Sequence, residues 1–290
     1  METRYLSGKE VSSDVFRALE PRIRALNNIH ITPGLGVILV GEDPASKVYV
    51  RAKTRKFEQL GLFSETIKLP SDCSQDKLLQ QIEGLNQDDR FHGILVQFPL
   101  PKPLSQEAVI EVINPAKDVD GLHPFNLGLL VSERPRFIPC TPKGIMRLLD
   151  YYNLNLNGKH VVIVGRSKLV GRPLSILTSM KKTWSNATTT ICHSGTKTIS
   201  DFTRQADVVI LAMGAPEFLK SSDVKAGSII VDVGINRVED DSDKGYRLVG
   251  DAHTPSLLGK VAALTPVPGG VGPITIAMLV ENTVEAAERA

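Results

Sequence analysis

The chain has 290 residues, which suits one large domain or two of ordinary size. Hydrophobic residues make up 42% and charged residues 23%, close to the average of globular proteins, and this excludes a disordered or fibrous chain. Lys plus Arg number 34 against 32 for Asp plus Glu, so the net charge of +2 favours neither a nucleic-acid nor a membrane-surface partner.

In the first half, short β-branched runs alternate with longer amphipathic stretches, the pattern of a parallel sheet flanked by helices. We expect strands at 36–40, 66–69 and 93–97, and helices near 10–27, 44–60 and 74–86. Asp43 can cap the second helix, Pro44 suits its first position and Gly61 suits its end. Dense prolines over 101–142 predict a long irregular connection with one helix near 105–112.

The second half restarts the alternation. We expect strands at 160–164, 187–192, 207–212 and 228–233. A domain boundary is placed near 143, where Thr141 and Pro142 resemble the cap and first residue of a connecting helix. A second boundary lies near 270, and 274–288 reads as one amphipathic helix. Periodicity alone does not decide which domain that helix packs on.

A buried strand that runs into a glycine turn and then a helix is the strongest general motif. It covers 161–173, with Gly165 and Gly171 bounding the turn and Ser167 between them. This geometry presents backbone N–H groups to a phosphate, although an ordinary strand–helix turn explains the spacing equally well.

The residues of the following strand favour a dinucleotide-binding site and indicate whether NAD or NADP binds there. NAD-binding domains usually carry an acidic residue about 20 residues after the turn, but 191–196 holds no carboxylate. Arg166 and Ser194 could instead bind a 2′-phosphate. The pattern therefore favours NADP.

Tyr49, Lys53 and Lys56 have the i, i+4, i+7 spacing of one helix face. A solvated basic face with one tyrosine is the simpler interpretation of that spacing. Tyr-x-x-x-Lys also occurs in short-chain dehydrogenases, but there it follows the glycine-rich turn. Here it precedes Gly165 by more than a hundred residues, which indicates an accidental match.

Two further segments place polar side chains at chain positions typical of ligand sites. Gln97 ends a buried strand, where parallel sheets bind ligands, although a Gln there can also satisfy a loop carbonyl. Asp118 and Asp120 flank Val119 before a glycine, and a turn with Asp118 as local acceptor explains this pattern. Asp120 could instead accept two N–H bonds from an amino-pyrimidine ring. No further metal ligands accompany the pair, so we expect no metal.

The cysteines and the N-terminus bear on location. Cys73, Cys140 and Cys192 lie far apart without Cys-x-x-Cys spacing, which favours a reducing compartment and no disulfide framework. The first residues lack the apolar core of a secretory signal, and no apolar run approaches the roughly 20 residues of a membrane span. We expect a cytoplasmic α/β enzyme with no membrane partner.

In combination these stretches resemble the methylenetetrahydrofolate dehydrogenase/cyclohydrolase (FolD) family over nearly the whole chain. The shared motifs are Tyr49-x-x-x-Lys53, Gly93–Pro99, Pro115–Gly121, Pro139-Cys-Thr-Pro-x-Gly144, Gly165-Arg-Ser-x-x-Val-Gly171, Val231–Asn236 and Pro266–Pro273. The resemblance implies two α/β domains with a cleft between them and a C-terminal helix that returns to the first domain. It implies a folate-binding catalytic domain at 1–143 with 271–290, a Rossmann-like NADP-binding domain with a parallel sheet at 144–270, and a homodimer formed through the NADP domain.

The resemblance also implies the reaction and the residues. Methylenetetrahydrofolate is oxidised by NADP to the methenyl cation, which water opens to 10-formyltetrahydrofolate. Lys53 is the cyclohydrolase residue, Gln97 holds it, Tyr49 stacks on the folate, and Asp120 binds the pterin edge. The implied cofactor contacts are Gly165, Arg166, Ser167, Gly171, Ser194, Gly214 and Ile235, and the remaining implied substrate contacts are Val96, Gly269, Gly270 and Pro273.

Elementary chemistry fits these residue types. Hydride loss from a carbon between two amines needs positioning more than acid or base, whereas hydration of a cation needs a base. Lysine serves only when neutral, and a cationic substrate with nearby Lys56 and Arg51 would lower the Lys53 pKa. Three alternatives remain open: a family member with one activity, another NADP-linked dehydrogenase, and a catalytically silent NADP-binding regulator.

Overall fold

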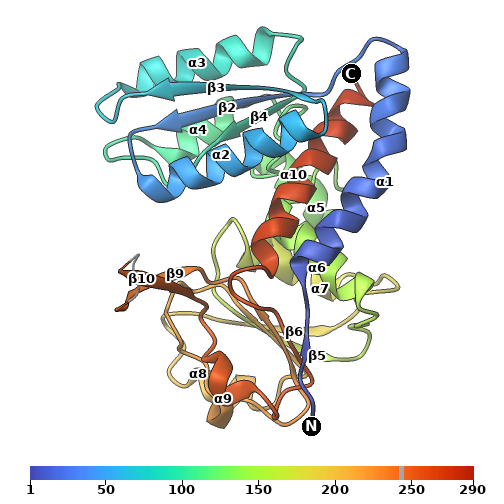
Figure 1. The fold of residues 1–290 in the computed structure, drawn as a ribbon, viewed down its shortest axis with the longest axis vertical. Helices are drawn as coiled ribbons and strands as arrows, with labels where there is room; N and C mark the ends of the chain where they lie inside the picture. Colours follow the sequence, from blue (N-terminus) through green and yellow to red (C-terminus); the bar gives the residue numbers. More distant parts are fainter. Residues whose placement is uncertain (242–244) are drawn as a thin grey trace. The chain divides into compact units, whose positions relative to one another are not determined.

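A computed structural model describes residues 1–241 and 245–290 and shows two compact α/β units (Figure 1). The first, which we call the three-stranded unit, comprises Asp14–Cys140 and Ile276–Ala290. The second, the six-stranded unit, comprises Met1–Ser13 and Thr141–Thr275. The α/β class and the parallel sheet expected from the sequence are confirmed.

The three-stranded unit is built on a parallel sheet with the order β3–β2–β4. Its strands are β2 (Gly34–Val40), β3 (Phe63–Leu69) and β4 (Gly93–Val96). Its helices are α2 (Pro44–Gln59), α3 (Gln75–Gln87), α4 (Gln106–Val112) and α5 (Pro124–Val131), with most of α1 (Gly8–Asn28) and α10 (Val271–Ala287). The crossovers β2–α2–β3 and β3–α3–β4 run in opposite directions along the sheet. Right-handed connections therefore place α2 and α3 on opposite faces, as Figure 1 shows.

The six-stranded unit has the strand order β1–β11–β8–β7–β5–β6, with every neighbouring pair parallel. Its strands are β1 (Arg4–Tyr5), β5 (His160–Val164), β6 (Thr188–Cys192), β7 (Val208–Leu211), β8 (Ile229–Asp232) and β11 (Ala263–Leu264), and β9 (Asn236–Glu239) pairs separately with β10 (Tyr246–Val249). Its helices are α6 (Cys140–Tyr151), α7 (Gly171–Ser179), α8 (Ile199–Thr203) and α9 (Thr254–Leu257), with a 3₁₀ turn, η1 (Ser221–Asp223). The sheet core is aliphatic, because β5, β7 and β8 each contribute buried Val, Ile or Leu.

The local signals around α2 are confirmed in detail. Oδ2 of Asp43 accepts a hydrogen bond of 2.7 Å from the backbone N–H of Ser46, and Pro44 is the first helical residue. The helix ends at Gln59, two residues before Gly61. These caps set where α2 begins and ends, and so set which of its side chains face the sheet.

The structure differs from the sequence expectation in several segments. Residues 1–13 and 271–275, which the expected division assigned to the folate domain, group with the six-stranded unit. At the N-terminus, β1 pairs with β11 and Leu6 is fully buried. The proline-dense connection contains a second helix, α5, which Nδ1 of His123 caps by accepting from the N–H of Phe125 at 3.0 Å. Pro124 favours this helix since it stands at the first helical position.

The C-terminal helix packs as the resemblance implied. From Ile276 onward α10 belongs to the three-stranded unit, where Val280 and Val284 are fully buried. Among the described residues, no helix is both long and apolar enough to span a bilayer.

Candidate active site

Lys53 and Gln97 come together in the three-stranded unit. Nζ of Lys53, in the middle of α2, donates a hydrogen bond of 3.0 Å to Oε1 of Gln97, which directly follows β4. Nε2 of Gln97 donates to the carbonyl oxygen of Phe98 at 2.7 Å, which turns the amide oxygen towards the amine. The backbone N–H of Gln97 donates to the carbonyl oxygen of Ile38 in β2 at 2.9 Å, so a bond to the neighbouring strand fixes this residue. The expected contact between Lys53 and Gln97 is present.

The surroundings of Lys53 lower the pKa of its amine. Burial lowers the pKa of the amine, while the negative charge of Asp120 and the nearby Cys140 thiol oppose the shift. The expected direction is thus confirmed, but its cause is desolvation and not neighbouring cations. The Nζ of Lys56 lies instead 4.7 Å from the centre of the Phe16 ring.

Two other expected folate contacts flank Lys53. Tyr49 lies one turn earlier on α2 with 37% of its surface exposed, so its ring is accessible to a ligand, and partial burial raises the pKa of its phenol. Val96, the last residue of β4, is a buried member of the core between the sheet and α3. Its side chain therefore serves packing.

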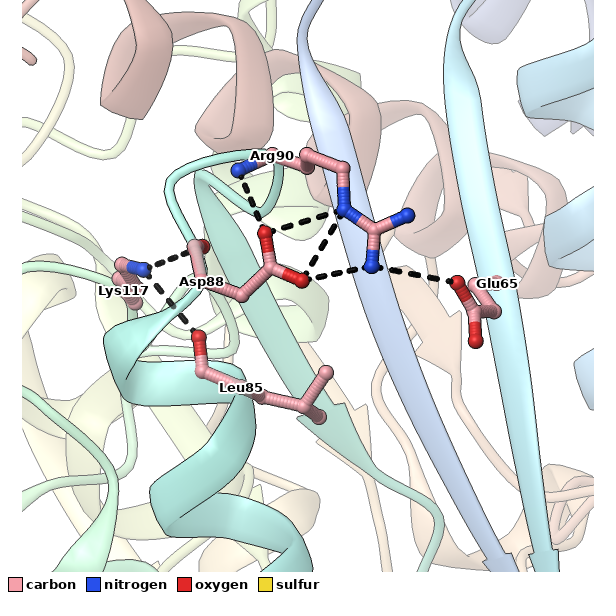
Figure 2. A network of polar contacts seen from close by, with 5 residues as sticks. All are labelled: Glu65, Leu85, Asp88, Arg90 and Lys117. Atoms are coloured by element: carbon pink, nitrogen blue, oxygen red, sulfur yellow. Dashed lines mark hydrogen bonds and ion pairs between the residues drawn. The ribbon is translucent and has the colours of Figure 1, made fainter.

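The segment that carries Asp120 is fixed at its start by Lys117, as Figure 2 shows. Nζ of Lys117 donates to the carbonyl oxygens of Leu85 at 3.2 Å and Asp88 at 2.9 Å, at the end of α3. The carbonyl of Lys117 accepts from the N–H of Ile94 in β4 at 2.8 Å. The Lys117–Gly121 loop is thus joined to both a helix end and the sheet.

The two carboxylates of this loop have different surroundings. Asp118 is buried and accepts hydrogen bonds from the N–H groups of Leu122 at 3.1 Å and His123 at 2.8 Å, and from Nδ2 of Asn126 at 2.8 Å. Burial raises the pKa of Asp118 to about 6, against the effect of these bonds. Asp118 is therefore the local acceptor that the sequence suggested, whereas Asp120 is only partly buried.

The loop closes on Gly121, where the backbone requires glycine. Its φ is +70°, and a Cβ atom would lie 2.8 Å from the nitrogen of Pro139 and 2.9 Å from the carbonyl carbon of Ile138. The backbone after Asp120 therefore packs directly on the segment that leads to Cys140.

The expected dinucleotide turn lies in the six-stranded unit, between β5 and α7. Gly165 has φ +127°, and a Cβ there would collide with the carbonyl of Ala212. Oγ of Ser167 accepts from the N–H of Val170 at 3.1 Å. The N–H of Arg172 donates to the carbonyl oxygen of Ser167 at 3.1 Å, so the turn between β5 and α7 is held by its own hydrogen bonds.

Arg166 and Ser194 follow neighbouring strand ends. Val164 of β5 pairs with Cys192 of β6, and both Arg166 and Ser194 are exposed just beyond this pair. Since 193–196 contains no carboxylate, this edge of the sheet fits a dinucleotide that bears a 2′-phosphate, with Arg166 and Ser194 to hold that group.

Two buried carboxylates that the sequence analysis missed organise the loops that carry Gly214 and Ile235. Asp251 accepts from the N–H groups of Met213 at 2.9 Å, Gly214 at 3.0 Å and Ala215 at 2.9 Å, and from Nδ2 of Asn236 at 2.9 Å. The N–H of Gly214 is therefore occupied by this carboxylate.

The second missed carboxylate, Asp232, ends β8. It accepts from the N–H groups of Gly234 at 2.9 Å, Asp251 at 3.0 Å and Ala252 at 2.7 Å, and burial raises its pKa to about 6. Asp232 is the one acidic residue in the apolar run 229–233, and this pattern could have predicted a buried carboxylate.

The remaining expected folate contacts also belong to the six-stranded unit. The carbonyl of Gly269 accepts from the N–H of Gly8 at 3.0 Å, and a Cβ at Gly272 would lie 3.8 Å from Cδ1 of Ile235. The structure thus groups Ile235 with the turn that carries Gly269, Gly270 and Pro273. Within the described residues, no three His, Cys, Asp or Glu side chains are grouped to hold a metal ion.

Comparisons with known proteins agree with this arrangement. The family model for the tetrahydrofolate dehydrogenase/cyclohydrolase catalytic domain matches residues 6–120, and the model for its NAD(P)-binding domain matches 139–290. The bifunctional protein FolD of Chlorobium chlorochromatii is 51% identical over 288 residues, which cover 98% of each chain.

Solved structures give the same result. That of the bifunctional FolD enzyme of Campylobacter jejuni is 44% identical, covers 99% of both chains and has a TM-score of 0.92. That of the Trypanosoma brucei FolD enzyme, in complex with NADP cofactor and inhibitor, is 34% identical, covers 100% of this chain and 98% of its own, and has a TM-score of 0.94. The chain belongs to the tetrahydrofolate dehydrogenase/cyclohydrolase family.

Proposed function

We propose that this protein is a bifunctional one-carbon folate enzyme. It oxidises 5,10-methylenetetrahydrofolate with NADP and hydrolyses the resulting 5,10-methenyltetrahydrofolate to 10-formyltetrahydrofolate. The observation that carries the proposal is the contact of 3.0 Å between Lys53 and Gln97, with a lowered lysine pKa, in a chain whose relatives are bifunctional FolD proteins.

The oxidation depends mainly on how the protein positions the folate and NADP. NADP, when bound, accepts the hydride. We infer that the carboxylate of Asp120 accepts N–H bonds from the aminopyrimidine ring and that Tyr49 stacks on the folate. Arg166 and Ser194 hold the 2′-phosphate. No side chain exchanges a proton in this step, because the nitrogen lone pairs of the substrate drive the loss of hydride.

The hydrolysis needs a base, and Lys53 supplies it. Water adds to the carbon between N5 and N10, and the neutral amine of Lys53 accepts one of its protons, which leaves a neutral carbinolamine. The bond from this carbon to N5 then breaks as the C–OH group becomes the formyl C=O, the hydroxyl proton passes to N5, and Lys53 releases its proton to solvent. Oε1 of Gln97 orients the amine through the hydrogen bond of 3.0 Å. The substrate cation favours the neutral amine further, since like charges repel.

One assay separates the proposal from its alternatives. Purified protein is mixed with NADP and methylenetetrahydrofolate, and the absorbances of NADPH and of the methenyl compound are followed together. A bifunctional enzyme forms NADPH without lasting methenyl accumulation, whereas a monofunctional dehydrogenase accumulates the methenyl compound. A protein that forms no NADPH and does not hydrolyse added methenyl compound would overturn the proposal and leave another NADP-linked dehydrogenase or the silent regulator.

We also propose that the protein forms a homodimer through the six-stranded unit. A hollow of about 440 Å³ lies beside β10, and its lining includes Tyr5 and Leu248, which are 48% and 37% exposed. Exposed apolar side chains around one hollow suit burial against a second copy of the chain.

A cytoplasmic location is proposed on cysteine chemistry. Cys73, Cys140 and Cys192 form no disulfide, and the last two are buried thiols, as is usual for chains kept in reducing compartments. Cell fractionation tests this location, and recovery of the protein outside the cytoplasm would contradict it.

A further inference from the structure

Asn282 is a fully buried polar residue on α10, far in sequence from the candidate active site. Its Nδ2 donates hydrogen bonds to the carbonyl oxygens of Val119 at 2.7 Å and Ile138 at 3.1 Å, and lies 3.7 Å from Sγ of Cys140. One side-chain amide therefore joins α10 to two separate chain segments of the three-stranded unit.

Both segments border the candidate folate site. Val119 directly precedes Asp120, and its carbonyl also accepts from Sγ of Cys140 at 3.4 Å. Ile138 belongs to the backbone on which Gly121 packs. The amide of Asn282 thus holds the backbone immediately before Asp120 and the segment that supports the backbone immediately after it.

We propose that Asn282 is a positioning residue for folate, which fixes the carboxylate of Asp120 through the carbonyl of Val119. The inference rests on the proposed folate site. Lys117 holds the start of the Lys117–Gly121 loop and Asp118 shapes its turn, whereas Asn282 supplies a contact from outside the loop beside the ligand-facing carboxylate. Asn282 touches no ligand itself.

The substitution Asn282→Leu tests this role, because it keeps a similar volume and removes the hydrogen bonds that Nδ2 donates to Val119, Ile138 and Cys140. We expect the KM values for methylenetetrahydrofolate and for methenyltetrahydrofolate to rise together, by roughly ten- to a hundredfold. Displacement of a substrate-positioning group by about 1 Å costs about that much. The KM for NADP should be unchanged, since Arg166 and Ser194 belong to the six-stranded unit.

Thr283→Val is the matched control. Thr283 is the next residue, is equally buried, and donates its hydroxyl to the carbonyl of Leu279 within α10 at 2.8 Å. This change removes a buried hydrogen bond without touching the loop, so it should lower Tm and leave both folate KM values unchanged. If Asn282→Leu behaves like Thr283→Val, Asn282 is merely structural and the proposal fails.

Asn282→Asp provides a second test that also serves if the leucine variant does not fold. An ionised carboxylate faces the carbonyls of Val119 and Ile138 with no donor, whereas the protonated form donates one hydrogen bond. The folate KM of this variant, relative to wild type, should therefore improve as the pH falls. A ratio that does not change with pH contradicts the inference.

Calorimetric binding of methenyltetrahydrofolate to the wild type and both Asn282 variants separates the two levels of the argument. If the wild type neither binds nor converts folates, both the proposed function and this inference are wrong. If the wild type is active and the variants bind folate with unchanged affinity, only the role of Asn282 is wrong.

Discussion

The charge state of Lys53 depends on two opposing effects. Burial disfavours the ammonium form, and the charge of Asp120 favours it, yet burial is the larger effect and the pKa falls. The hydrogen bond to Gln97 is compatible with either form, because an amide oxygen accepts from an amine or an ammonium group. Burial thus acts in the direction that the proposed base requires, without a neighbouring cation.

Lys53→Met should separate the two reactions. The change keeps the length of the side chain and removes the base. Methenyl hydrolysis should fall by roughly a hundred- to ten-thousandfold, the contribution of a positioned acid or base, while NADPH formation survives in part. The measurement follows methenyl absorbance, which should accumulate as NADP is reduced. Lys56→Met, the same change three residues further along α2, is the control and should hydrolyse at the wild-type rate. Native hydrolysis by Lys53→Met would contradict the assignment.

Asp118 should make stability depend on pH in the acid range. Its pKa is raised from 3.8 to about 6, so the folded state holds the proton more tightly than the unfolded state. The resulting stabilisation is present in full below pH about 4, is lost as the pH rises through about 6, and amounts to roughly 3 kcal/mol at most.

Urea unfolding between pH 4 and 7 measures this contribution. Asp118→Asn removes the titration and should flatten the fall in stability over that range, although it also places an amide donor against N–H groups and lowers stability at every pH. Equal pH slopes for the variant and the wild type would show that Asp118 does not titrate there.

At the scale of elements, we propose that the ends of β5 and β6 determine the choice between NADP and NAD. Arg166 and Ser194 are exposed beyond paired strand ends, and no acid stands there to repel a 2′-phosphate. Replacing Arg166 by Ala should raise the KM for NADP about ten- to a hundredfold, since a charged hydrogen bond is worth ~1.5–3 kcal/mol. Any weak activity with NAD should persist. Steady-state kinetics with both cofactors measure this effect, and Arg204→Ala, at the residue that directly follows α8, is the control. Equal loss with NADP and NAD would make Arg166 structural.

The loops after β7 and β8 are joined by the hydrogen bonds that Asp251 accepts. Asp251→Asn should turn an amide donor towards the N–H groups of Met213, Gly214 and Ala215. We expect the loop to shift and the KM for NADP to rise by about tenfold or more, as for a displaced positioning group. Folate affinity in the absence of NADP, measured by calorimetry, should be unchanged. A variant whose affinity for folate falls and whose affinity for NADP does not would contradict this role.

For the whole molecule, the sequence predicted what depends on local signals. The start of α2 at Pro44 follows from its cap, and the β5–α7 turn follows from its glycines. What escaped prediction depends on distant partners. β1 is two residues long and exists because β11 lies beside it. The sequence does not distinguish Asn282 from the polar residues beside it, Glu281 and Thr283, because its partner Val119 is 163 residues away.

Leu248→Glu should dissociate the proposed homodimer. Leu248 lies on β10 beside the hollow that Tyr5 also lines, and a charge there would be buried without a partner at an interface. Sedimentation equilibrium should give a dimer for the wild type and a monomer for the variant. Val131→Glu places the same charge at a 63% exposed position on α5 of the three-stranded unit, and it should remain dimeric. The Lys53–Gln97 contact lies within one chain, so methenyl hydrolysis should survive dissociation. A monomeric wild type would refute the dimer outright, and a dimeric Leu248→Glu would move the interface away from β10.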